Sequence, residues 1–159
     1  MTCVIIDDEP LARECITNYV ATVDFLKLAG VGNNPVDLIR LMEDHSPDLI
    51  FLDIQMPVMN GIDFLKANPR LPMVIITTAY PNYALEGFQL DVLDYLVKPI
   101  VFNRFFQAVT KAKEYHQLVR RSTDSNKSGI DYFFVKCGYT FERIFFDDLM
   151  YVEGLQNYI

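Results

Sequence analysis

Leu49-Ile50-Phe51-Leu52-Asp53 is a run of large apolar residues that ends in a carboxylate. A run with no polar residue on either face is typical of a strand that is buried on both sides in a parallel sheet. Asp53 would then lie where that strand ends, and in open α/β sheets ligands bind at this carboxyl edge. The run therefore predicts an α/β fold with a carboxylate at the ligand-binding edge of its sheet.

A second apolar run, residues 3–6, also ends in acidic residues, namely Asp7, Asp8 and Glu9. If the two strands are neighbours, Asp7, Asp8 and Asp53 surround one point, which is costly unless a cation lies among them. Oxygen ligands in a small site favour Mg²⁺. A solvated acidic rim remains the alternative for each cluster taken alone.

Two more strand ends carry polar groups. Residues 73–76 lead to Thr78, and Asp94–Val97 leads to Lys98. A carboxylate can act as a covalent nucleophile, and phosphoryl transfer to it needs a metal ion, a cation and donors around the phosphoryl oxygens. Taken singly, Thr78 is an ordinary strand-end residue and Lys98 a solvated one. Together with Asp53 they predict phosphoryl chemistry at one edge of the sheet.

Strand and helix patterns alternate along the chain as far as about residue 120. This alternation predicts a parallel sheet with helices on both of its faces. We expect the second strand at residues 25–31 and helices at Pro10–Ala21, Pro35–His45, 62–67, 82–89 and 103–120.

Several local signals predict details of these elements. Leu11 is expected to contact the core from the first helix, and Gly61 is expected to supply a positive φ before the third helix. Asn103 is a good N-cap for the last helix. Phe105 and Phe106 belong to an apolar stripe on that helix, most of which is core, while one or two of its aromatics could contact a partner.

Composition excludes several classes of protein. No run approaches the roughly 20 apolar residues of a membrane span, and the net charge of −7 argues against a strong nucleic-acid surface in these residues. Cys3, Cys15 and Cys137 are too widely spaced for a zinc site or a disulfide framework, so we expect reduced thiols and a cytoplasmic protein. His45 and His116 are expected to be isolated surface residues.

Four segments match the motifs of a known family: VIIDDEP (residues 4–10), LIFLDIQMPVMNG (49–61), VIITTAY (74–80) and DYLVKP (94–99). Residues 1–121 resemble the receiver domain of bacterial two-component response regulators. The resemblance implies a flavodoxin-like, doubly wound (βα)5 fold whose parallel sheet has the strand order 2-1-3-4-5. It also implies a phosphoacceptor signalling protein rather than an enzyme, with chemistry limited to its own phosphorylation and dephosphorylation.

The resemblance assigns roles to the acidic residues. Asp53 would be the phosphoacceptor. Mg²⁺ would be bound by Asp8 and Asp53, by Asp7 partly through water, and by the backbone carbonyl of Gln55. Gln55 would also lie beside the path of the water that hydrolyses the aspartyl phosphate, and so would influence its lifetime.

The remaining strand ends receive roles in the same way. Thr78 and Tyr95 would form the switch pair, and Lys98 would contact the phosphoryl group. Lys98 and Pro99 would be joined by a cis peptide bond. Tyr80 would hinder the approach of water, although an ordinary surface aromatic is an equally good interpretation of this residue.

The chain changes character after residue 121. Residues 122–130 are polar and without periodicity, which indicates a flexible linker, and residues 131–159 are rich in aromatic and β-branched residues. We expect antiparallel strands at Tyr132–Cys137, 141–146 and 149–152.

This C-terminal segment resembles the opening strands of a LytTR-type (LytR/AlgR family) DNA-binding domain, with the motif FFVKCGYTFERIFFDDLMYVEGLQNYI at residues 133–159. The stretch YALEGFQLDVLDYLVKPI at residues 83–100 is typical of receivers joined to such domains. The segment is much shorter than a complete domain of that family, so we expect a truncated form of it. Open strand edges then favour self-association as a homodimer.

The leading interpretation is a response regulator that receives a phosphoryl group from a sensor histidine kinase. The signal would pass through the surface of helix four, strand five and helix five to an output that binds promoter DNA, which this segment alone is not expected to do. A receiver that acts as an adaptor through protein–protein contacts and dimerisation is the alternative. An aspartyl-phosphate hydrolase is disfavoured, because Gln55 stands where such enzymes carry a second acid.

Overall fold

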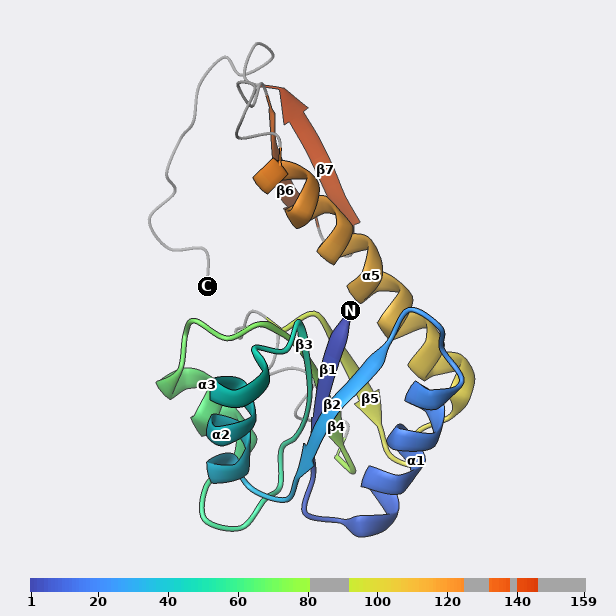
Figure 1. Ribbon diagram of the computed structural model, residues 1–159, viewed down its shortest axis with the longest axis vertical. Helices are drawn as coiled ribbons and strands as arrows, with labels where there is room; N and C mark the ends of the chain where they lie inside the picture. Colours follow the sequence, from blue (N-terminus) through green and yellow to red (C-terminus); the bar gives the residue numbers. More distant parts are fainter. Residues whose placement is uncertain (81–91, 125–131, 138–139, 146–159) are drawn as a thin grey trace. The chain divides into compact units, whose positions relative to one another are not determined.

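Five parallel strands form one sheet in the order β2-β1-β3-β4-β5, which confirms the predicted order. The computed structural model describes residues 1–80, 92–124, 132–137 and 140–145 (Figure 1). The strands are β1 (Thr2–Ile6), β2 (Lys27–Gly32), β3 (Leu49–Asp53), β4 (Met73–Thr78) and β5 (Asp94–Val97).

Helices cover both faces of this sheet. They are α1 (Pro10–Ala21), α2 (Pro35–His45), α3 (Gly61–Ala67) and α5 (Phe102–Asp124). Figure 1 shows α1 and α5 on one side of the sheet and α2 and α3 on the other. The predicted helix at residues 82–89 lies outside the described residues.

The apolar run in β3 is explained by the two layers of core. Leu49 and Phe51 belong to the cluster beneath α1 and α5, whereas Ile50 and Leu52 belong to the cluster beneath α2 and α3. All four side chains are almost completely buried. Because successive residues of a strand point to opposite faces, a strand covered by helices on both sides has no polar face.

Asparagine side chains cap the N-termini of α2 and α3. The Asn34 side chain accepts hydrogen bonds from the backbone N–H groups of Val36 and Asp37 at 2.8 and 3.0 Å. Asn60 accepts one from Ile62 N–H at 2.8 Å. These bonds satisfy amide donors that have no partner inside the helix.

Helix α1 contacts the sheet differently from the prediction. Ile16 and Val20 are buried, but Leu11 is 73% exposed, so its assignment to the core was wrong. Leu11 lies in the first turn of α1, which projects past the carboxyl edge of the sheet. An apolar residue at the right helical spacing is therefore not buried, because the sheet ends before it.

Helix α5 begins at Phe102 and not at Asn103, so Asn103 lies inside the first turn and is not the N-cap. The aromatic residues of the apolar stripe on α5 differ in burial. Phe105 is buried and stacks on Phe51, whereas Phe106 is 46% exposed. Phe106 is therefore the aromatic of this pair that could contact a partner.

The histidine His116 is not isolated. Its Nε2 atom lies 3.1 Å from Asp48 Oδ1, while Asp48 Oδ2 accepts hydrogen bonds from the backbone N–H and the hydroxyl of Thr2 at 2.7 and 2.9 Å. Burial alone would raise the pKa of Asp48, but these hydrogen bonds and the nearby imidazole lower it below its usual value. The contact joins α5 to the amino edge of the sheet.

The chain separates into two compact units, Met1–Gln117 and Leu118–Ile159. Helix α5 continues through Asp124, so the first residues of the predicted linker 122–130 are helical. In the second unit β6 (Tyr132–Cys137) and β7 (Thr140–Phe145) form an antiparallel pair, as predicted. The strand expected at residues 149–152 lies outside the described residues.

Two properties of the described residues bear on the composition analysis. Their helices include none that is both long and apolar enough to cross a membrane. Cys3 and Cys15 are free thiols, and burial raises the pKa of Cys3 to about 12, which makes it an unreactive core residue.

Candidate functional site

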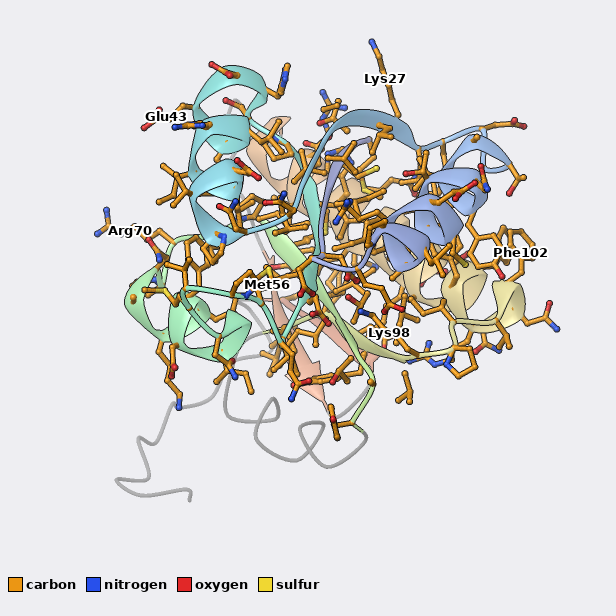
Figure 2. The ribbon with its side chains drawn as sticks, turned by 90° about the horizontal axis from the view of Figure 1, so that it is seen from below. Lys27, Glu43, Met56, Arg70, Lys98 and Phe102 are labelled. Atoms are coloured by element: carbon orange, nitrogen blue, oxygen red, sulfur yellow. The ribbon has the colours of Figure 1, made fainter. Side chains whose placement is uncertain are left out.

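The polar residues at the strand ends are brought to one edge by the register of the sheet. Ile6 pairs with Leu52 across β1 and β3, Asp53 pairs with Thr77 across β3 and β4, and Thr78 pairs with Val97 across β4 and β5. Asp7, which follows β1, is therefore level with Asp53, and Lys98 comes directly after the residue that pairs with Thr78. Figure 2 looks onto this edge, with Lys98 near the middle of the view.

Three carboxylates meet at this edge. One carboxylate oxygen from each of Asp7, Asp8 and Asp53 lies within 4.8 Å of the others. Asp7 and Asp53 are buried, whereas Asp8 is exposed. The predicted acidic cluster is thus formed by residues from two distant segments, the end of β1 and the end of β3. It is open to solvent on the side of Asp8.

Asp7 is oriented by its neighbours, and its second carboxylate oxygen faces Lys98. Oδ1 accepts a hydrogen bond from Glu9 N–H at 2.9 Å, and the Arg13 guanidinium donates to the Asp7 carbonyl oxygen. Oδ2 is buried and lies 2.8 Å from the Lys98 ammonium. The carboxylates of the cluster offer oxygen ligands only, and such a donor set fits Mg²⁺.

Lys98 extends into the same cluster. Its Nζ atom lies 2.8 Å from Asp7 Oδ2 and 3.3 Å from Asp53 Oδ1. The backbone N–H of Lys98 donates to Thr78 O at 2.7 Å, and the peptide bond between Lys98 and Pro99 is cis, as the resemblance implies. The ammonium is thus directed at the two buried carboxylates.

Burial sets the electrostatics of the site. It raises the pKa of Asp53 to about 6, an effect to which the charge of Asp7 adds and which Lys98 opposes. Burial likewise raises the pKa of Asp7 above its usual value, against the opposing effect of Lys98. For Lys98, burial alone would lower the pKa, but the two carboxylates outweigh it and raise it. Three carboxylates meet one ammonium here, so the cluster has a net negative charge when all three are ionised.

Gly61 lies behind Asp53. The glycine has no positive φ, so the predicted reason for it was wrong. Its backbone N–H donates to Ile54 O at 2.8 Å, and a β-carbon at this position would lie 2.3 Å from the Asp53 carbonyl oxygen. The residue in the left-handed region of this loop is Val58, with a φ of 78°.

The remaining predicted residues lie around the acidic cluster. The Thr78 hydroxyl is buried and accepts a hydrogen bond from Tyr80 N–H at 3.0 Å. Tyr95 is partly buried against the core cluster of α2 and α3. Gln55 and Tyr80 are exposed.

Two features of the site were not predicted. The contact of Arg13 with the Asp7 carbonyl links α1 to the end of β1, and a cavity of about 430 Å³ lies beside Lys98. Glu9, Leu11 and Ile100 are among the residues that line this cavity. The sequence did hold a signal for the Arg13 contact, because an arginine stands in the first turn of the helix that follows the acidic end of β1. No local sequence pattern indicates the cavity.

Residues 3–110 match the model of the response regulator receiver domain. The chain belongs to this family. Receiver domains of response regulators are signalling proteins, and the flavodoxin-like sheet described above is their fold.

Two named relatives are similar to this chain. The chain is 38% identical over 119 residues to the positive alginate biosynthesis regulatory protein of Pseudomonas aeruginosa, covering 70% of this chain and 47% of the relative. It is 35% identical over 127 residues to the sensory transduction protein LytT of Enterococcus faecalis, covering 77% and 52%. The chain therefore spans about half the length of these curated relatives.

Solved structures agree on the fold. The receiver domain of AraT from Geobacillus stearothermophilus superposes with a TM-score of 0.65 at 30% identity, covering 75% of this chain and 97% of that domain. The response regulatory domain of mrkE from Klebsiella pneumoniae gives a TM-score of 0.68 at 25% identity, covering 74% and 99%.

Proposed function

We propose that this receiver accepts a phosphoryl group on Asp53, in a Mg²⁺-dependent reaction, from a sensor histidine kinase. The contact of Lys98 Nζ with Asp53 Oδ1, 3.3 Å long at the carboxyl edge of the sheet, is the observation that carries the proposal. It puts a cation beside a nucleophile, in a cluster of carboxylates whose charge a divalent cation would balance.

The chemistry requires little from the protein beyond positioning. An oxygen of Asp53 attacks the phosphorus of a phosphohistidine, the P–N bond breaks, and the imidazole leaves with the electron pair and takes up a proton. Lys98 neutralises charge on the transferred oxygens. The Thr78 hydroxyl accepts from the Tyr80 amide through its oxygen, so its own proton is not used in that bond and can be donated to a phosphoryl oxygen.

Asp7, Asp8, Asp53 and the backbone carbonyl of Gln55 would hold the metal ion. When bound, Mg²⁺ supplies positive charge to the phosphoryl oxygens as a Lewis acid. The convergence of three carboxylate oxygens within 4.8 Å of one another supports this assignment. Asp8, which is exposed, gives the ion a route of entry from solvent.

The signal would leave the site through Thr78 and Tyr95. In this proposal Thr78 moves towards the phosphoryl oxygen and Tyr95 turns inward. This alters the surface of β5, α5 and the helix predicted at residues 82–89, which lies outside the described residues. Phe106, exposed on α5, is a candidate contact on that surface for a second copy or for an output domain. Gln55 and Tyr80 would set the lifetime of the phosphoryl group.

We further propose that the complete protein carries a LytTR-type output that binds promoter DNA. The resemblance of residues 133–159 to the opening strands of such domains supports this output, as does the antiparallel pair β6–β7. An adaptor that acts through protein contacts would share the receiver but lack the output, and DNA binding by the complete protein distinguishes the two.

The test uses acetyl phosphate and Mg²⁺ as the donor mixture and intact-mass spectrometry as the readout. We expect one added phosphoryl group, no addition to Asp53→Asn, and normal addition to the control Asp63→Asn, which alters an exposed acid of α3. Addition to Asp53→Asn at the wild-type level would contradict the assignment.

A further inference from the structure

Lys98 contacts three carboxylates that differ in their exposure. Its ammonium lies 2.8 Å from Asp7, 3.3 Å from Asp53 and 3.5 Å from Glu9. The side chains of Asp7 and Asp53 are buried, whereas that of Glu9 is 56% exposed. The partners of the ammonium therefore extend from the buried interior of the site, at Asp7 and Asp53, to its exposed rim, at Glu9. The ammonium lies closest to Asp7.

The inner contact conflicts with a metal ion. Lys98 meets Asp7 through Oδ2, the oxygen that is not bound by the Glu9 backbone amide. Two cations that share one carboxylate repel each other at short range. Metal binding among Asp7, Asp8 and Asp53 therefore requires the ammonium to withdraw from Asp7.

The fold limits where the ammonium can go. The backbone of Lys98 is held by its hydrogen bond to Thr78 O, so the movement is confined to the flexible side chain. Asp53 and Glu9 are the two other carboxylates already in contact with the ammonium. Withdrawal from Asp7 towards the rim of the site leads to Glu9.

We infer that Glu9 is a positioning residue for Lys98: it holds the ammonium in an outer position, beside Asp53, when a divalent cation occupies the aspartate cluster. This inference rests on the proposed function, since it presupposes the metal site. Glu9 would act through Lys98 and need not touch the metal ion or the phosphoryl group. Its backbone bond to Asp7 Oδ1 is independent of the side chain.

A simpler effect must be separated from this one. Glu9 adds negative charge near the cluster and would attract a divalent cation through its field alone, without Lys98. A double-mutant cycle between Glu9→Gln and Lys98→Met separates the two effects. Glu14→Gln, at an exposed position of α1, removes the same charge and serves as the control.

Calorimetric titration with Mg²⁺ gives the first readout. With Lys98 present, we expect Glu9→Gln to weaken Mg²⁺ binding about two- to five-fold, the range of a partly exposed ion pair, and Glu14→Gln to leave it unchanged. In the Lys98→Met background, Glu9→Gln should have no effect. An equal weakening in both backgrounds would assign the effect to the field and overturn the inference.

Acetylation of Lys98 by acetic anhydride, measured by peptide mass spectrometry, gives the second readout. Mg²⁺ should leave the amine protected in the wild type and expose it in Glu9→Gln; equal protection in both would also overturn the inference. If the wild type and Asp8→Ala show the same absence of Mg²⁺ binding, the proposed metal site fails and this inference with it. Normal binding by the wild type with no coupling rejects the role of Glu9 alone.

Discussion

The backbone of Gly61 lies against the backbone of Asp53, so closely that a β-carbon on Gly61 would be 2.3 Å from the Asp53 carbonyl oxygen. Gly61 is the first residue of α3, and Asp53 is the last residue of β3. The start of the helix therefore fixes the main chain that carries the candidate phosphoacceptor. Because the close neighbour is backbone, it cannot yield by a change of rotamer.

Gly61→Ala should destabilise the protein by roughly 1–3 kcal/mol, the usual cost of overpacking a buried position. Gly30→Ala is the matched control, because its β-carbon would meet the end of the flexible Leu41 side chain, which can move. Urea unfolding of both variants measures the difference. Equal losses would show that the Asp53 backbone adapts easily.

Asp53→Asn should stabilise the protein at neutral pH when divalent cations are absent. Burial raises the pKa of Asp53 to about 6, so the folded state favours the protonated carboxyl group. The wild type is then most stable relative to the variant below the usual aspartate pKa, and it loses stability as the pH rises from about 4 to about 6. A shift of about two pKa units corresponds to at most about 3 kcal/mol.

Urea unfolding in a chelator, at about pH 4 and about pH 7.5, tests this linkage. The gain in Asp53→Asn should be present at the higher pH and vanish at the lower one. Asp63→Asn, at an exposed site, should show no comparable change. A gain that is independent of pH would indicate that the carboxylate charge is not its cause.

Mg²⁺ should raise the stability of the wild type, because it binds the folded cluster and relieves the repulsion among Asp7, Asp8 and Asp53. At a concentration ~10 times Kd, the gain is about 1.4 kcal/mol. Asp8→Ala should lose most of it. Differential scanning calorimetry with and without Mg²⁺ measures the effect, and the same shift in both proteins would indicate binding elsewhere.

Val58→Asn should stabilise the protein by about 1 kcal/mol. Val58 has a φ of 78° and is 90% exposed, so it has left-handed backbone strain without compensating burial. Asparagine tolerates this region better than a β-branched residue. Val58→Ala retains a β-carbon and should gain less. Thermal unfolding compares the two variants, and a loss in Val58→Asn would show that the valine side chain contributes a stabilising contact.

Asp48→Asn should destabilise the protein by roughly 1 kcal/mol at neutral pH, since hydrogen bonds to a charged group are stronger than neutral ones. The pKa of Asp48 is lowered, in opposition to its burial, by Thr2 and His116. Its stabilising contribution is therefore complete above the usual aspartate pKa and is lost as the pH falls below it. Urea unfolding from neutral to acidic pH should show the two proteins converging, and a constant difference would rule out the carboxylate charge.

The strands and the chemistry at their ends followed from local patterns. Buried runs such as Leu49–Asp53 mark strands by composition alone, and parallel strands place their carboxyl ends at one edge whatever the details of packing. Asp7, Asp53, Thr78 and Lys98 could thus be assigned to one site before any contact was known. The bounds of α2 were also predictable, because Pro35 and Pro47 limit it on both sides.

Contacts between distant segments could not be predicted in this way. Leu11 has the spacing of a core residue, yet its turn of α1 extends past the sheet, and the need for glycine at Gly61 comes from the Asp53 backbone rather than from its own φ. The pairing of His116 with Asp48 joins segments 68 residues apart. A local pattern reports which faces of an element are apolar, but the neighbour opposite each face depends on how all the elements pack together. That packing also determined that one lysine, Lys98, contacts Asp7, Glu9 and Asp53 at once.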